Sequence, residues 1–419
     1  MSDAPPRTPT DWSGERMQRR IARRYRAERR FRLLGLAAIA LSAAFLLVLL
    51  GSMLTRGIGG FTETRIALPL DLAAAKLAVD PARLKGRGAD LALADAGLEE
   101  AVDAAANAAW PTLGGAALLS DGAWLRVRGA VEADPTLLVR RATVEVPVAS
   151  AIDIACKGDG TPEAEAIVRA LGDQLSRGFN RDFLTAADST DPTRVGIWGA
   201  LKGSLMTMFV TIALAFPVGV LAALYLEEYA PRNRWTDLIE VSINNLAAVP
   251  SIIFGLLGLA VFLGTFGLPR SAAIVGGLTL ALMTMPVIVI AGRNAIRAVP
   301  PSIRDAALGV GASPVQVVFH HVLPLALPGI LTGTIIGVAR ALGETAPLLL
   351  IGMRAFIAAP PDRLTDPATV LPVQVFLWSD EVNRGFVEKT SAAIVVLLVL
   401  LLAMNGIAIY LRNRFETRW

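Results

Sequence analysis

Residues 325–353 read LALPGILTGTIIGVARALGETAPLLLIGM. The run is long enough to cross a hydrocarbon core about 30 Å thick, which takes roughly 20 apolar residues in a helix. Unlike an ordinary span, it contains two charged residues, Arg340 and Glu344. Each costs roughly 2.5 to 3.5 kcal/mol or more if it faces lipid, so this helix must lie against other helices or an aqueous path. The stretch therefore predicts a bundle of membrane-spanning helices.

Three glycines, Gly329, Gly333 and Gly337, mark the face of this helix that carries the charges. At 100° per residue, they fall with Arg340 and Glu344 within about 80° of one another. Small residues four apart allow close helix packing, and the i,i+4 spacing lets the two charges touch. Two interpretations stay open: a structural ion pair, or a site where Arg340 exchanges its carboxylate for an oxyanion that fits the guanidinium fork.

Five further apolar runs accompany this one in a chain with 54% hydrophobic and 18% charged residues. The six predicted spans lie at residues 33–54, 203–226, 241–266, 271–292, 325–353 and 390–411. Eighteen Lys and Arg flank them on the side of the N-terminal tail, against five in the two short loops on the other side. The positive-inside rule then predicts a multi-pass protein of the inner membrane with both termini cytoplasmic.

The N-terminal tail, residues 1–32, contains ten arginines. Because the first span follows it and lacks a small-residue cleavage site at its end, we interpret this span as an uncleaved anchor. Contact of the basic tail with anionic lipid headgroups explains its charge, and no nucleic-acid partner is needed.

Residues 55–194 differ in kind from the rest, because they are charged and rich in Asp and Ala. Alternation at residues 124–128 (WLRVR) and 143–146 (TVEV) predicts strands there. The segment is long enough for a core of its own, and it follows the first span, which predicts an extracytoplasmic α/β domain. Cys156 lies in this domain as the single cysteine, so it forms no intrachain disulfide. The fold class is therefore an all-α polytopic membrane bundle of six predicted spans, five of them in residues 195–419, with an inserted soluble α/β domain at 55–194.

The predicted cytoplasmic loop, residues 293–324, contains a recognisable pattern. Asp305-Ala306-Ala307, then Gly311, then Leu323-Pro324 resembles the EAA loop of ABC-importer permeases at both of its spacings. The resemblance implies that this loop helix docks in a groove of an ATPase subunit. The neighbouring His320 and His321 predict no metal site, because adjacent histidines project to different sides of a helix and no carboxylate or thiol lies at ligand spacing.

A second resemblance surrounds the charged pair. Residues 339–347, ARALGETAP, are similar to the R-A-x-G-E-T-A-P motif of PstA-type phosphate-importer permeases. Residues 222–230, AALYLEEYA, and 245–256, NLAAVPSIIFGL, resemble further segments of that family. The resemblance covers about residue 195 to the end of the chain. The partner permease type, PstC, shares part of the motif but typically lacks the Ala-Pro after Glu-Thr.

The resemblance implies a heteromeric importer of inorganic phosphate. In it, a PstC-like permease completes the pathway, a PstB-like ATPase dimer binds ATP and Mg²⁺, and a PstS-like extracytoplasmic protein delivers the anion. This chain itself is then expected to be no enzyme, to bind no cofactor and to hydrolyse nothing. The sequence also contains no phosphate-binding loop of the G-x-x-x-x-G-K-S/T type.

Other functions remain as alternatives. One is a PstC-type permease, or a permease for another oxyanion, because a single arginine does not distinguish phosphate from sulfate or molybdate. Another is a membrane-anchored sensor or scaffold whose outer domain binds a ligand, and a third is a membrane enzyme with its catalytic site in that domain.

Overall fold

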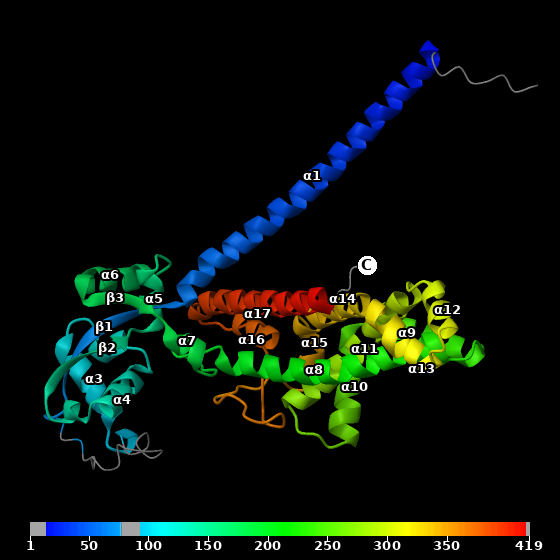
Figure 1. Ribbon diagram of the computed structural model, residues 1–419. Coiled ribbons are helices and arrows are strands. Elements are labelled where there is room, and N and C mark those ends of the chain that lie inside the picture. Colours follow the sequence, from blue (N-terminus) through cyan, green and yellow to red (C-terminus); the bar gives the residue numbers. More distant parts are fainter. Residues whose placement is uncertain (1–13, 76, 78–92, 416–419) are drawn as a thin grey trace, which may run out of the picture. The chain divides into compact units, whose positions relative to one another are not determined.

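The computed structural model describes residues 14–75, 77 and 93–415 (Figure 1). The chain forms two compact units, Met1–Thr55 and Arg56–Trp419, and each is described by itself. The part of the predicted basic tail at residues 1–13 lies outside the described residues.

The first unit consists of most of helix α1 (Glu15–Gly60). The basic segment from Glu15 onward is helical and continues without a break into the predicted span 33–54. Large apolar side chains of this helix are exposed, among them Phe31, Leu34, Phe45 and Val48. Such a helix is stable when lipid covers it, which agrees with a membrane span.

In the second unit, the inserted α/β domain follows the end of α1. Its elements are β1 (Thr62–Asp71), α3 (Leu98–Ala109), η2 (Gly115–Leu118), α4 (Ala123–Ala133), η3 (Pro135–Leu138), β2 (Arg141–Pro147), α5 (Ser150–Cys156), α6 (Pro162–Leu171), η4 (Gly172–Gln174), β3 (Leu175–Phe179) and α7 (Arg181–Thr185). The three strands form one antiparallel sheet in the order β2-β1-β3.

The core of this domain lies between the sheet and its helices. Ile66 and Leu68 of β1 are fully buried and belong to one apolar cluster with Leu98 of α3 and Val127 of α4. The strand predicted at residues 143–146 is confirmed as part of β2.

The strand predicted at residues 124–128 is wrong, because these residues belong to helix α4. Ala123, Val127 and Val131 are the buried residues of this helix, spaced four apart as on one helical face. Five alternating residues are too few to distinguish a strand from such a helix, and the longer apolar stripe decided the structure.

The rest of the second unit is a helical bundle. Its elements are α8 (Trp198–Leu224), η5 (Tyr225–Tyr229), α9 (Arg234–Ala248), α10 (Ser251–Gly258), η6 (Leu259–Thr265), α11 (Ala273–Arg297), α12 (Pro301–Gly309), α13 (Pro314–Gln316), η7 (Val317–Val322), α14 (Leu323–Leu342), α15 (Ala346–Leu350), α16 (Leu371–Ser379) and α17 (Gly385–Phe415). The elements η5, η6 and η7 are π-helical turns that continue a preceding helix. In the part of the chain that the structure describes, five helices are long and apolar enough to cross a membrane, and a bent helix pair brings the total to six if it counts as one span.

Helix α11 is the central helix of this bundle, in contact with α8, α9, α10 and α14 (Figure 1). Gly277 of α11 lies against Val210 of α8, and the Thr211 hydroxyl donates to the Gly277 carbonyl at 3.2 Å. Helix α17 packs against α14 and α16.

Two predicted spans are broken in the structure. The span predicted at 241–266 consists of α9 and then α10 with η6, bent by 101° at Val249 and Pro250. A proline has no backbone N–H to donate, and it forces the preceding residue into an extended conformation, which Val249 adopts.

The span predicted at 325–353 is also wrong as one helix. Helix α14 ends at Leu342, Gly343 follows as its cap, and α15 begins only at Ala346 with Pro347 in its first turn. Glycine is a poor helix former and proline favours a helix start, so both residues favour a break here.

Candidate functional site

Arg340 and Glu344 meet at the C-terminal end of α14. The Arg340 Nε lies 3.4 Å from Glu344 Oε1. Arg340 occupies the last turn of the helix, whereas Glu344 lies beyond Gly343, in the break before α15. The contact therefore joins the last turn of α14 to the segment that follows it. The sequence predicted instead that both residues lie on one face of a continuous helix.

The Arg340 guanidinium is only partly occupied by this contact. Among the described residues, Glu344 is the one carboxylate within ion-pair distance, and neither terminal nitrogen of Arg340 makes a hydrogen bond. The Arg340 side chain is 50% exposed, against 19% for Glu344. A cation near a helix C-terminus is favoured by the helix dipole. The arrangement leaves a guanidinium fork free to bind an anion.

The glycines of α14 face α11. A Cβ built at Gly329 would lie 2.7 Å from the Cβ of Ala295, one at Gly333 would overlap Ala291, and one at Gly337 would lie 3.0 Å from Thr284 Cγ2. Backbones can approach this closely only where no side chain intervenes. The glycine face thus fixes α14 against α11, with Arg340 just beyond the last glycine contact.

The EAA-like loop forms a helix, a turn and a second helix. Asp305, Ala306 and Ala307 lie in α12, and Gly311 follows in the left-handed conformation with φ of 89°. Ser313 then caps α13 in a reciprocal capping box with Gln316. Leu323 and Pro324 open helix α14.

The outer face of this loop is apolar and uncovered. Ala307 is buried against the bundle, whereas Asp305 and Ala306 are exposed. Leu308, Val310 and Val315 are exposed by 50%, 85% and 56%. Exposed apolar side chains grouped on a loop outside the spans indicate a protein-protein contact.

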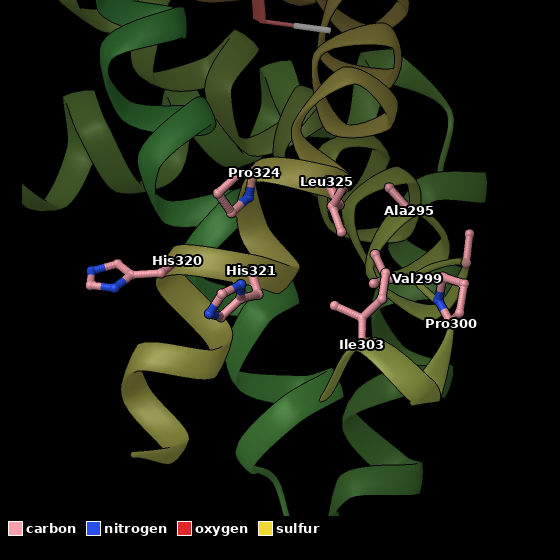
Figure 2. A pocket seen from close by; sticks show the side chains of 9 residues that line it. Ala295, Val299, Pro300, Ile303, His320, His321, Pro324 and Leu325 are labelled. Carbon is pink, nitrogen blue, oxygen red and sulfur yellow. The ribbon is translucent and has the colours of Figure 1, made fainter. Parts of the chain in front are cut away.

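A pocket of about 750 Å³ lies behind the loop, between the end of α11, α12 and the start of α14 (Figure 2). It is lined by Ala295, Ala298, Val299, Pro300, Ile303, His320, His321, Pro324 and Leu325. Figure 2 shows His320 projecting away from the other labelled side chains. In the described ranges, no group of three His, Cys, Asp or Glu is placed to hold a metal ion.

Six charged residues, here called the loop charge cluster, gather where η5 and the C-terminal end of α11 meet the middle of α9 and helix α12. They are Glu227, Glu228, Glu240, Arg293, Arg297 and Arg304. From the sequence, these arginines indicated only the orientation of the spans. Glu227 and Glu228 served only as part of the PstA-like segment at residues 222–230. The sequence does contain a signal for this cluster. Glu227 and Glu228 directly follow the predicted span 203–226, on the same predicted side of the membrane as the three arginines.

Two families match the chain. Residues 18–166 match a domain of unknown function (DUF3333), and residues 215–417 match the binding-protein-dependent transport system inner membrane component. The second match includes the EAA-like loop and the Arg340–Glu344 pair.

Similar proteins with a stated role are permeases. The phosphate transport system permease protein PstA 1 of Mycobacterium tuberculosis (strain CDC 1551 / Oshkosh) is 33% identical over 207 residues, 49% of this chain and 67% of the relative. PstA of Mycobacterium leprae is 36% identical over 50% of this chain and 68% of its own length, and PstA of Haemophilus influenzae is 30% identical over 53% and 78%. A solved structure of the MetNI methionine ABC transporter superposes with a TM-score of 0.43 at 18% identity, over 53% of this chain and 98% of that chain.

The apolar helical bundle and these sequence matches define a permease subunit of an ABC importer. It is a multi-pass inner-membrane protein and not an enzyme. More narrowly, the chain belongs to the PstA family of phosphate transport system permease proteins. Importers of this class act with an ATPase and a binding protein.

Proposed function

We propose that this chain forms part of the phosphate pathway of an ATP-driven importer, and that Arg340 binds the anion as it passes. The observation that carries the assignment of Arg340 is its guanidinium, half exposed in an apolar bundle and held by one carboxylate contact at 3.4 Å. A guanidinium presents paired donors that match phosphate oxygens, and Glu344 neutralises the charge when no anion is bound.

The loop supplies the connection to ATP hydrolysis. Helix α12, with its exposed Leu308 and the neighbouring Val310, docks on the ATPase, and ATP binding draws this helix toward its counterpart in the second permease. This movement reorients the helix that presents Arg340 and opens the pathway alternately to the two sides. The loop and both termini then lie in the cytoplasm, as the excess of Lys and Arg indicates.

The partners follow from this role. A PstC-like permease completes the pathway, two PstB-like subunits bind ATP and Mg²⁺, and a PstS-like protein delivers phosphate on the outer side. This chain holds no cofactor of its own. The PstA relatives support phosphate as the anion.

The assignment of Arg340 is tested by phosphate uptake into liposomes that contain the complete importer. R340A is expected to lower uptake by about tenfold to a hundredfold, because hydrogen bonds to a charged group contribute about 1.5 to 3 kcal/mol. E344Q keeps the shape of the side chain and leaves the arginine available, so it should retain most of the uptake. Competition by sulfate and molybdate measures the choice of anion.

The matched variant separates the two interpretations of the pair. A purely structural ion pair predicts that R340A and E344Q lower the melting temperature alike and lower uptake alike. Intact uptake by R340A at wild-type expression would show that the pathway does not depend on this arginine.

A further inference from the structure

Arg304 connects three elements at the base of α12. Its Nη2 lies 2.6 Å from Glu228 Oε1, and its Nε lies 3.3 Å and 3.4 Å from the two oxygens of the same carboxylate. Nη1 donates to the Val299 carbonyl at 2.7 Å, and Nη2 also donates to the Ile296 carbonyl at 3.1 Å. Every nitrogen of this guanidinium therefore has a partner, in contrast to Arg340.

The partners belong to different parts of the bundle. Glu228 lies in η5, which continues α8, while Ile296 lies in the last turn of α11 and Val299 lies just after the end of that helix. The two side chains are mostly buried, with 24% of Arg304 and 12% of Glu228 exposed. A shielded, forked pair fixes the relative position of two elements far better than an exposed pair does.

Helix α12 has a second attachment, which is apolar. Ala307 belongs to one buried cluster with Val317, Val318 and Val322 of η7, and η7 continues directly into α14. The same cluster extends to Ala223 and Leu224 of α8, so α8 shares this apolar packing and is joined to α12 by charge in addition.

We infer that Arg304 and Glu228 are a positioning pair that makes α8 follow the movement of α12. The inference rests on the proposed function, in which α12 receives the movement of the ATPase. With the pair intact, α8 and α14 move together and the pathway between them changes as one unit. With the pair broken, α8 keeps only its apolar contacts and follows α12 less closely, so ATP is hydrolysed with less transport.

The first test compares phosphate uptake with ATP hydrolysis in liposomes that contain the complete importer. R304Q and E228Q are expected to lower the phosphate taken up per ATP hydrolysed about tenfold, the size of a typical coupling between sites. The double variant R304E/E228R exchanges the two charges and restores an ion pair. It should recover part of the phosphate uptake per ATP that the single variants lose. The control is R297Q, which removes a charge from the end of α11 at a side chain that is 60% exposed, and which should stay near wild type.

Some outcomes of this test overturn the inference. One is an unchanged ratio of phosphate to ATP in R304Q. Another is loss of the ATPase from the purified R304Q complex with a normal ratio in what remains, since that would reveal a role in assembly alone. A wild-type complex that hydrolyses ATP without taking up phosphate would count against the proposed function instead.

A second measurement does not depend on the transported anion. Spin labels on S302C and R232C, in a chain that also has C156S, report the distance between α12 and the segment that follows η5. The inference predicts that ATP binding leaves this distance nearly constant in the wild-type background and changes it in R304Q. A constant distance in both backgrounds would overturn it.

Discussion

Asp188 lies in the connection between the α/β domain and α8. Its carboxylate accepts hydrogen bonds from the Trp378 indole and from the Ser189 backbone N–H, both at 3.0 Å. Burial raises the pKa of Asp188, although these hydrogen bonds act in the opposite direction. The folded chain therefore binds a proton at this residue more readily than the unfolded chain does.

This shift predicts a pH dependence of stability. Because the folded pKa lies above the unfolded value of about 3.9, the contribution of Asp188 is complete below that value and is lost as pH rises through the folded pKa. D188N keeps an oxygen that accepts from Trp378, and it cannot ionise. The melting temperature of D188N should therefore increase relative to that of wild type as pH rises.

The control is D362N. Lys202 lowers the pKa of Asp362, so the contribution of this residue is present above the unfolded value and is lost as pH falls. From acidic to neutral pH, the melting temperature relative to wild type should therefore rise for D188N and fall for D362N. Parallel curves for wild type and D188N would contradict the assignment.

Single residues differ in how far the sequence predicts their partners. The contact of Arg340 with Glu344 could be predicted, because the two residues are four apart and any helical or turn geometry keeps them close. The contact of Arg304 with Glu228 could not, because 76 residues separate them and only the packing of α12 beside η5 joins them.

At the scale of elements, α14 and α11 depend on the glycine face. A side chain at Gly333 would overlap Ala291, whereas one at Gly406 of α17 would meet nothing within 4 Å. G333V is therefore expected to force the two helices apart and to cost about 1 to 3 kcal/mol, the usual range for overpacking.

The measurement is the thermal unfolding of the chain purified in detergent, with G406V as the control. Valine at either position has the same helix propensity, so the difference between the two variants isolates the helix contact. Equal melting temperatures for G333V and G406V would show that the helices tolerate a wider separation.

The lengths of the elements were easier to predict than their breaks. Each apolar run of about 20 residues contains a long helix or a pair of helices, because hydrophobic thickness fixes the length of such runs. Pro250 and Gly343 were visible inside two of these runs, but whether such residues bend, break or merely weaken a helix depends on what packs around them. The short WLRVR stretch failed for a related reason, since its side chains fit a strand or a helix equally well until α4 packs on the sheet.

At the scale of the whole second unit, a buried lysine joins the α/β domain to the bundle. The Lys157 Nζ, at the end of α5, lies 2.7 Å from Asp153 Oδ2 and 2.8 Å from Glu388 Oε2 at the start of α17. It also donates to the carbonyls of Gly59 and Thr62, at 2.8 Å and 3.2 Å. One side chain therefore contacts the end of α1, the α/β domain and α17.

The order of the domains could be predicted from composition, but this junction could not. Lys157 and Glu388 are 231 residues apart and read as ordinary surface charges in the sequence. Only the fold shows that the Lys157 side chain is 7% exposed, which turns a solvated charge into a buried one that needs its partners.

The junction predicts the effect of K157M. Methionine fills a similar volume but leaves the carboxylates of Asp153 and Glu388 in a sheltered site without their cation, which costs about 3 to 5 kcal/mol when a buried pair loses one partner. Hydrogen exchange should speed up in α5 and in the first turns of α17, before the rest of α17 is affected. K202M is the matched control, because it breaks an ion pair of the same length, 2.7 Å, with Asp362, which is 86% exposed, and such pairs contribute about 0 to 1 kcal/mol. If K157M and K202M gave the same melting temperature and the same exchange pattern, Lys157 would not be the residue that holds the α/β domain against α17.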